Sequence, residues 1–288
     1  MQTLERYNKA LLTTEDGTIR LLNTVLDRSF NRLIRRARVH MRLGLSDPAQ
    51  RNVLLLQEFR QLIPAVRPDK VDAYDKLFRN LSLEASRTGL LAASSITEEL
   101  LPTRPRVDVS IPLEATIAAA SQAKGYLRRH GDAFATTSAE VVAQGIAEGR
   151  PADSMVQDMR SRLSIVKSRA TTIVRTESIR AYSTASDQYY ATNGIDLVMF
   201  YATSDDRSCP ICASRAGRTY KRSDLKLPLH PRCRCTKAPY DPDLAAIDPD
   251  YAALASKHRE EVAKHSGISL SDDLTKAVFE SRAPIPVI

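Results

Sequence analysis

The side chains best suited to chemistry gather in one short part of the chain. They are all four cysteines and one of the five histidines, namely Cys209, Cys212, His230, Cys233 and Cys235. A Cys-x-x-Cys pair places two thiolates on one side of a tight turn, where both can reach a single cation. Zinc in structural sites takes four nitrogen or sulfur ligands in a tetrahedron, so the later residues must supply a second pair. The spacing therefore predicts one zinc ion per chain.

The second pair of ligands has two possible compositions. His230 and Cys233 form a His-x-x-Cys pair, whereas Cys233 and Cys235 form a Cys-x-Cys pair. Cys209 and Cys212 are the safest ligands, and the choice among the other three candidates stays open. A zinc ion held by four protein ligands has no open position for catalysis, so the site is expected to be structural. Free or disulfide-paired thiols are the alternative to a metal.

A change of sequence period places these ligands on β-structure. Asn193-Gly194 is a typical end of a helix, and the segment 195–203 that follows is rich in β-formers. Residues 216–220 have the character of a turn into a second short strand. The two halves of the ligand set bracket a hairpin, so we expect an α+β domain with a short zinc-stapled β-hairpin.

Long amphipathic helices are predicted in the first hundred residues, which makes the protein mainly α. Apolar residues recur at the spacing of one helical face over 15–43 and 69–100. Thr14 is expected to cap the first of these helices. Ser46-Asp47-Pro48 is typical of the start of another helix, which would end before Pro64. The three helices predict an N-terminal helical arm.

Prolines and glycines divide the rest of the chain. Residues 102–112 contain three prolines and are expected to form an extended linker. A helical pattern resumes at Leu113, with breaks expected at Gly131 and at Gly149-Arg150-Pro151, and a last helix is predicted between Tyr251 and His265. The predicted domains are a helical arm (1–101), the linker (102–112), a domain with the Cys/His hairpin (113–240) and a C-terminal tail with one helix (241–288).

The amino-acid composition indicates which kinds of partner the protein would bind. A net charge of +8 and a sequence pI near 9.4 favour acidic partners such as nucleic acid or an acidic protein surface. Arginines are dense on one predicted helix, although a solvated helix face explains them equally well. They are Arg28, Arg32, Arg35, Arg36, Arg38 and Arg42. No run approaches the roughly 18 apolar residues of a membrane span, so no membrane partner is expected. Charged residues within Met1–Ala10 replace the apolar core of a signal peptide, and we expect the protein to stay where it is made.

The motifs stand in a particular order along the chain. A helix with Arg175-Thr176-Glu177 is followed by a strand, by Asp-x-Arg-x-Cys-Pro-x-Cys, by the hairpin and by His-Pro-x-Cys-Arg-Cys. This order resembles the phage Mu F-like minor head proteins, a head-morphogenesis family, over Gly149 to Pro239. Members usually carry a tryptophan in the strand before the Asp-rich turn. Here Phe200-Tyr201 fills that place, and the chain has no tryptophan.

The resemblance implies a structural virion component and no enzyme. Such a protein is incorporated near the portal during head assembly and influences DNA packaging or ejection. Portal or neck proteins and capsid proteins are the implied partners, and non-specific contact with packaged DNA is a secondary property. The implied location is the virion, after assembly in the host cytoplasm. The apolar end of the chain, 283–288, is held extended by prolines and is expected to help in docking to such a partner.

Glu177 is informative without the resemblance, because it falls within the apolar stripe of its predicted helix. A carboxylate there needs a charged or hydrogen-bonded partner. Arg175 lies on another face of that helix, so the partner is expected from the hairpin or from a neighbouring helix. We expect Glu177 to be structural.

Two other functions compete with the virion role. An HNH-like nuclease needs a base histidine and further polar ligands, but only His230 lies near the cysteines, and the remaining histidines are expected at the surface. These are His40, His130, His258 and His265. A zinc-containing DNA-binding module would use the basic residues around the hairpin. These are Arg218, Lys221, Arg222, Arg232, Arg234 and Lys237.

Overall fold

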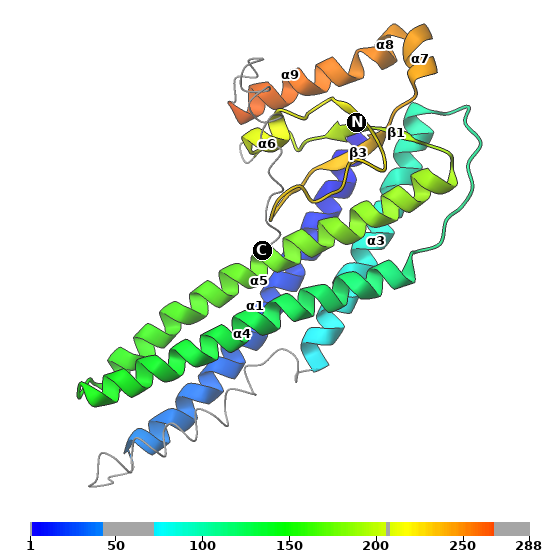
Figure 1. Cartoon of the computed structure of the whole chain (residues 1–288). Helices are drawn as coiled ribbons and strands as arrows, with labels where there is room; N and C mark the ends of the chain where they lie inside the picture. The colour runs from blue at the N-terminus through cyan, green and yellow to red at the C-terminus, as the bar shows by residue number, and fades with distance from the viewer. Residues whose placement is uncertain (1, 43–71, 206–207, 268–288) are drawn as a thin grey trace. The chain divides into compact units, whose positions relative to one another are not determined.

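The computed structural model describes residues 2–42, 72–205 and 208–267, and most of them are helical (Figure 1). The long helices are α1 (Gln2–Arg42), α3 (Asp72–Leu100), α4 (Leu113–Ala147) and α5 (Ala152–Thr192). The strands are β1 (Leu197–Tyr201), β2 (Thr219–Lys221) and β3 (Thr236–Pro239). The short helices are α6 (Pro210–Ala213), α7 (Pro242–Ile247), α8 (Pro249–Ala252) and α9 (Leu254–Ser266). The predicted mainly α class with a small β element is confirmed.

The chain forms two compact units, and neither is a single stretch of sequence. The sheet unit comprises Met1–Thr14, Ser82–Ala119 and Arg175–Ile288, and the helical unit comprises Glu15–Leu81 and Ala120–Val174. Each of the four long helices contributes residues to both units. The predicted domains, 1–101, 102–112, 113–240 and 241–288, stay a prediction.

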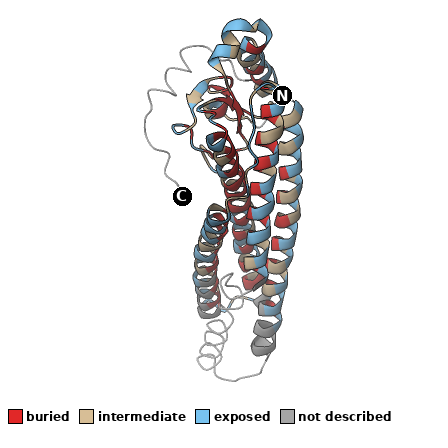
Figure 2. Cartoon of the chain, turned by 90° about the vertical axis from the view of Figure 1, so that its right-hand side faces the viewer, coloured by how far each residue is buried: buried red, intermediate tan, exposed pale blue. Residues whose placement is uncertain are grey.

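The helical unit has its own hydrophobic core. Its apolar residues recur every three or four positions, so each long helix turns one buried stripe toward its neighbours (Figure 2). Among the large buried side chains are Leu22, Leu26, Phe30, Tyr74, Phe78, Leu127, Phe134, Met159 and Leu163. Phe30 and Phe134 meet edge to face with their ring centroids 6.3 Å apart. Leu22, Leu26, Phe30, Tyr74 and Phe78 lie on the apolar faces that helical spacing predicts over 15–43 and 69–100.

A three-stranded antiparallel sheet with the order β2-β1-β3 is the centre of the sheet unit. The predicted hairpin corresponds to β1 and β2, with Val198 opposite Tyr220. β3 adds to the other side of β1, with Phe200 opposite Lys237. The sequences of the three strands lack the three-to-four-residue spacing of apolar residues that is typical of a helix. β1 and β3 pair although they are far apart in the sequence.

Helices cover both faces of this sheet. Successive residues of a strand point to opposite faces, so Lys237, which is paired with Phe200, and Tyr201 point to different faces. On one face, Lys237 of β3 reaches α5, where its Nζ lies 2.7 Å from both carboxylate oxygens of Asp187. On the other face, Tyr201 stacks on His258 of α9 with the ring centroids 4.2 Å apart. The sheet therefore lies between α5 and α9 (Figure 1).

Several local expectations hold. α3 and the break at Gly149 and Pro151 appear as predicted, since α4 ends at Ala147 and α5 begins at Ala152. Gly194 ends α5 with a positive φ of 65°, a conformation that glycine adopts without steric cost. Residues 102–112 form neither helix nor strand. They are nevertheless attached to the sheet unit, because the Asn193 side chain accepts from the Val107 amide and donates to the Val107 carbonyl.

Two expectations about helix ends were wrong. Thr14 does not cap a helix, because α1 already begins at Gln2, and the Thr14 hydroxyl donates to the carbonyl of Ala10 within the helix. Gly131 does not break α4, which is continuous from Leu113 to Ala147. Buried neighbours such as Leu127 and Phe134 outweigh the roughly 1 kcal/mol that a helical glycine costs.

Some predictions lie outside the described residues. They concern the helix expected between Ser46 and Pro64 and the apolar end, 283–288. No helix within the described ranges combines the length and the apolar character that crossing a membrane requires.

Candidate metal centre

The first pair of cysteines lies at a single turn of helix, α6, which is the next element after β1. Cys209 is the N-cap residue of α6, in an extended conformation with φ −80° and ψ 158°, and Pro210 occupies the first turn. The Cys209 carbonyl accepts from the amides of Cys212 and Ala213 at 3.0 and 2.9 Å. This turn brings the Cys209 and Cys212 side chains, three residues apart, to the same side. Cys212 is buried, and Cys209 is partly exposed.

The second group of ligands lies on the turn that leads into β3. The Cys233 amide donates to the His230 carbonyl at 3.1 Å, which closes the turn. Within it, Arg232 has a φ of 61°, the left-handed conformation that non-glycine residues rarely adopt. Cys233 and Cys235 are both buried, and β3 begins directly after them. One of these turns thus follows β1, and the other leads into β3, which is paired with β1.

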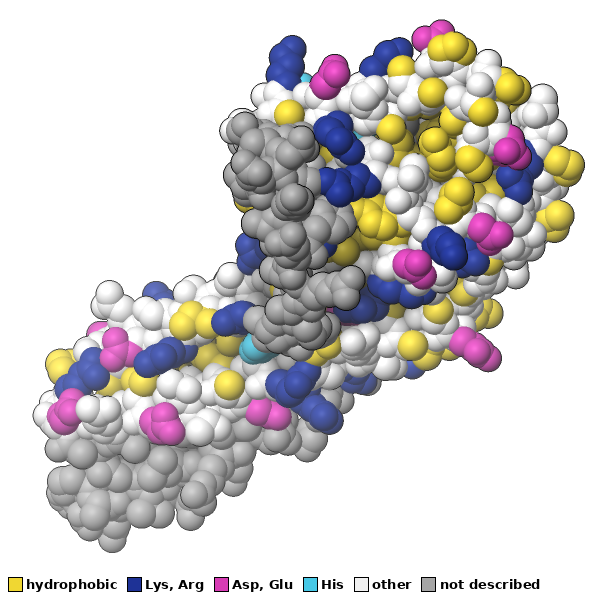
Figure 3. All heavy atoms as spheres, turned by 45° about the horizontal axis from the view of Figure 1, so that its top comes forward, with side chains coloured by type: hydrophobic (Ala, Val, Ile, Leu, Met, Phe, Trp, Pro, Cys, Tyr) yellow, Lys and Arg dark blue, Asp and Glu magenta, His cyan; other side chains and the backbone are white. Residues whose placement is uncertain are grey.

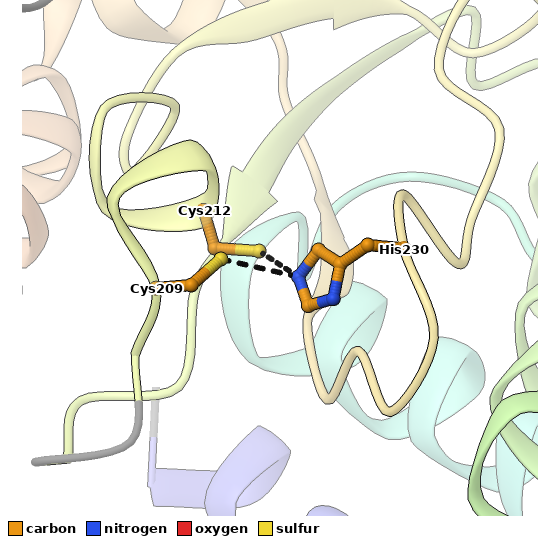
Figure 4. Close-up of side chains that lie close together, drawn as sticks. All are labelled: Cys209, Cys212 and His230. Carbon is orange, nitrogen blue, oxygen red and sulfur yellow. Dashed lines mark hydrogen bonds between the residues drawn. The ribbon is translucent and has the colours of Figure 1, made fainter. Parts of the chain in front are cut away.

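All five predicted ligands converge. His230 Nε2 lies 3.2 Å from Cys209 Sγ and 3.1 Å from Cys212 Sγ (Figure 4). Cys212 Sγ lies 4.0 Å from Cys233 Sγ. The ligand atoms form two groups, Cys209–Cys212–His230 and Cys212–Cys233–Cys235, and within each group they lie within 4.8 Å of one another. Cys212 belongs to both groups, and none of the four cysteines forms a disulfide.

The distances and the donor types fit a transition metal such as zinc. Zinc bound tetrahedrally by sulfur at about 2.3 Å and nitrogen at about 2.0 Å holds its ligand atoms roughly 3.5 to 3.8 Å apart. The separations of 3.1 to 4.0 Å bracket this spacing. Thiolate and imidazole ligands favour zinc over magnesium or calcium, which prefer oxygen. Five donors are present for four positions, and the choice among His230, Cys233 and Cys235 stays open.

Hydrogen bonds among the cysteine thiols and His230 shift the pKa values of these groups. The hydrogen bond with Cys212, helped by His230, lowers the pKa of the Cys209 thiol to about 4. Cys209 and Cys233 raise the pKa of His230 to about 10. The neighbouring thiols, Cys209 first, raise the pKa of Cys212. A divalent cation bound by these groups would displace the shared protons, so metal binding at this cluster would release protons.

Glu177 of α5 is buried, as expected, but its partner is not the one expected. Its Oε2 lies 3.0 Å from Nε of Arg180, three residues further along the same helix. Burial raises the pKa of the Glu177 carboxyl, and Arg180 opposes that shift. The expectation of a partner from the hairpin or another helix was wrong, because a residue three positions away lies on the same helical face.

Three residues near the cluster were not predicted as part of the site. The Thr176 hydroxyl accepts from the Arg232 amide at 3.1 Å. The Arg234 guanidinium binds the Asp205 carboxylate through two bonds of 2.6 and 2.8 Å. A signal for the second contact exists in the sequence, since Asp205 precedes the first cysteine pair and Arg234 lies between the last two cysteines. Their opposite charges flank the two halves of the site.

The other candidates from the sequence are arranged differently. His258 is buried, so its expected surface position was wrong, because α9 packs onto the sheet there. Arg234 and Lys237, two of the six basic residues proposed to contact DNA, are paired with Asp205 and Asp187, and Lys237 is buried. Basic and acidic side chains are interspersed on the described part of the face in Figure 3. Arg28, Arg32 and Arg35 are exposed on α1, whereas the side chains of Arg36, Arg38 and Arg42 lie outside the described ones.

The comparison with known families covers the stretch of chain that holds this cluster. The family model described as Phage Mu protein F like protein matches residues 137–238, about a third of the chain. The matched stretch includes Arg175-Thr176-Glu177 and all five candidate ligands, and it begins within α4, ahead of Gly149. No curated protein and no solved structure matches the chain. Over residues 137–238, the chain is therefore similar to the family described as Phage Mu protein F like protein.

Proposed function

We propose that the protein is a minor head protein of a phage virion, associated with the portal or neck, and that its Cys/His cluster holds one structural zinc ion. The observation that carries the proposal is the coincidence of two features in one stretch. Residues 137–238 match the head-protein family, and the same stretch holds five nitrogen and sulfur donors that converge in space. The proposed partners are portal or neck proteins and capsid proteins, and the proposed location is the virion, after assembly in the host cytoplasm.

The donor cluster suits a structural role. Four protein ligands would fill the coordination sphere of zinc, and a closed sphere stabilises a fold without binding substrate. Such a site would tie the turn after β1 to the turn before β3. The metal ligands lie among residues of the sheet unit's core, in which Cys212, Cys233 and Cys235 are buried. We therefore propose that zinc stabilises the sheet unit, which would then present surfaces for assembly.

Zinc content tests the metal part of this proposal. Purified protein should contain about one zinc ion per chain by elemental analysis. Alkylation of Cys209 in the native state should be slow with zinc and fast after chelation. Protein without any transition metal, with Cys209 freely alkylated, would rule out the zinc site.

Virion composition tests the assembly part. The chain should be found in purified heads of the phage that encodes it, and it should co-purify with that phage's portal protein at high salt, because a protein interface depends little on counterion release. The exposed arginines of α1 are the observation that favours DNA contact as a secondary property. DNA binding would instead weaken steeply with salt. Cleavage of plasmid DNA by the protein, with no incorporation into heads, would favour the HNH-like nuclease.

A further inference from the structure

The two halves of the donor cluster are far apart in the sequence, with Cys209 and Cys212 on one turn and His230, Cys233 and Cys235 on another. Four protein ligands can bind one cation tightly only if both turns are held at the right separation. Contacts between protein groups near the cluster provide such restraints without contributing any ligand atom. These contacts involve Asp205, Arg234 and Thr176.

The first restraint joins the segment that precedes the first cysteine pair to the turn that carries Cys233 and Cys235. Arg234 lies between Cys233 and Cys235, and its Nη1 and Nη2 atoms bind the Asp205 oxygens at 2.6 and 2.8 Å. The pair is mostly shielded from water, with 15% of the arginine and 31% of the aspartate side chain exposed. A two-pronged contact of this kind fixes orientation as well as distance. The Thr203 hydroxyl also donates to the Arg234 carbonyl at 3.0 Å.

The segment after β1 therefore holds Arg234 by its side chain and by its backbone. On the same turn, the Asp205 carbonyl accepts from the Ser208 amide at 3.2 Å. Ser208 also bonds to the Thr203 carbonyl through its hydroxyl, directly before Cys209. Thr203 and Asp205, which bind Arg234, thus precede the first cysteine pair in the sequence.

The second restraint ties the His230–Cys233 turn to α5. The Arg232 amide donates to the Thr176 hydroxyl at 3.1 Å. Arg232 adopts the left-handed conformation, with a φ of 61°, between His230 and Cys233. A non-glycine residue holds this conformation only when its surroundings require it. Thr176 is partly buried and lies next to the buried Glu177, so this contact attaches the turn to the long helix α5.

We infer that Thr176 and the Asp205–Arg234 pair are positioning residues that preorganise the metal centre. They hold the two ligand-bearing turns in place, so that less ordering is required when the cation binds. The inference rests on the proposed metal site and assigns a role within it to residues that are not ligands. Outer partners of metal ligands commonly change metal affinity by about 10–100-fold.

The test compares zinc affinity among matched variants of the full chain. Thr176→Val and Asp205→Asn should each weaken zinc binding by about 10–100-fold, measured by competition with a chromophoric chelator. Zinc stoichiometry should still reach about one per chain at high zinc. The absorption spectrum of the cobalt-substituted variants should match that of the original protein, because the ligands are unchanged.

The control variants alter similar groups elsewhere. Thr171→Val removes a hydroxyl of α5 that bonds to the Lys167 carbonyl within the helix. Asp158→Asn removes a charge that is paired with Arg150. Both controls should bind zinc as tightly as the original protein. Equal weakening in the controls would show a general loss of stability and would contradict the inference.

Arg232→Gly separates the role of Thr176 from a folding defect. Glycine adopts the left-handed conformation freely, so the turn should depend less on its anchor. The effect of Thr176→Val should therefore be smaller in the Arg232→Gly background, and an equal effect in both backgrounds would contradict a role through Arg232. If the original protein binds one zinc and the Thr176 and Asp205 variants bind it equally well, the inference fails and the metal site stands. If the original protein binds no zinc, the proposed site itself fails.

Discussion

Among the candidate ligands, Cys212 has the most central position. It is the one residue common to both groups of donors, with neighbours at 3.1 Å (His230) and 4.0 Å (Cys233). Cys209 belongs to the first group only, and Cys235 to the second only. The geometry therefore ranks the ligands by how many others each can join around a single cation.

This ranking predicts the outcome of single substitutions. Cys212→Ser should reduce zinc content the most, because Cys212 is the donor that belongs to both spatial groups. One of the variants His230→Asn, Cys233→Ser and Cys235→Ser should retain about one zinc per chain, since five donors compete for four positions. Zinc content after dialysis against a weak chelator measures this for each variant. Full zinc retention in Cys212→Ser would contradict the central position.

His258 shows how burial changes a titratable side chain. Only 3% of it is exposed, and its Nε2 accepts from the Ala202 amide at 3.1 Å. Its Nδ1 has no hydrogen-bond partner among the residues that the structure describes. Desolvation lowers the pKa of His258 to about 4. The neutral ring is therefore part of the folded state, and protonation would remove the acceptor at the end of β1.

The stability of the sheet unit should depend on pH through this residue. A lowered pKa in the folded state means that the stabilisation is fully present above about pH 6.5 and is lost as the pH falls toward 4. The loss should approach about 3 kcal/mol, at about 1.4 kcal/mol for each pKa unit. Urea unfolding between pH 7 and 4 should show a smaller acid loss in His258→Gln than in the original protein. His265→Gln, at an exposed position, is the control, and identical pH profiles for His258→Gln and the original protein would contradict this account.

At the scale of elements, α9 approaches the turn before β2 closely. Gly217 lies in that turn with a φ of 70°, and a Cβ atom at this position would overlap the carbonyl oxygen of Ala255 on α9. Arg259 of α9 also donates to the Ala216 carbonyl at 3.3 Å. Glycine is thus required at position 217 both for the backbone conformation and for the packing of a helix.

Alanine substitutions can separate these two requirements. Gly194→Ala should cost about 1–2 kcal/mol, because Gly194 is left-handed but its Cβ would meet only Arg104 Nη2, at 3.5 Å. Gly217→Ala should cost clearly more, since backbone atoms must also move. Unfolding free energies measure both losses, and hydrogen exchange should show reduced protection of α9 in Gly217→Ala alone. Equal losses for the two variants would indicate that the α9 contact contributes little.

On the scale of the whole molecule, two hydrophobic cores share four long helices. The buried candidate ligands Cys212, Cys233 and Cys235 belong to the core of the sheet unit, together with Leu4 and Leu11 of α1. The helical unit has a separate core. The proposed zinc site is thus connected to parts of α1, α3 and α5 that are distant from it in sequence.

Metal removal should therefore act on one unit. Zinc binding contributes on the order of 10 kcal/mol to small structural sites, so chelation should destabilise the sheet unit most. Hydrogen exchange with and without chelator should show lost protection in β1–β3 and in the part of α3 after Ser82. The helical unit, including 120–147 and 152–174, should keep its protection. A uniform loss across both units would show that they do not unfold separately.

The sequence by itself determined the features that depend on neighbouring residues. The spacing of Tyr74, Phe78 and Leu81 predicts α3, and Gly194 predicts the end of α5, because helical period and helix stops involve only a few residues. The ligand types and the family resemblance were likewise readable from short motifs. The five candidate ligands lie together in the structure, and their binding of zinc stays a proposal.

Only the tertiary structure decided the features that depend on distant contacts. β3 joins β1 across more than thirty residues of chain, which also brings Arg234 to Asp205. Gly131 stays helical because the core around it compensates for its cost, and His258 is buried because α9 packs on the sheet. Local propensities differ by roughly 1 kcal/mol per residue or less, whereas burial of a large apolar side chain contributes about 1.5–3 kcal/mol. Packing therefore overrides local preference wherever the two disagree.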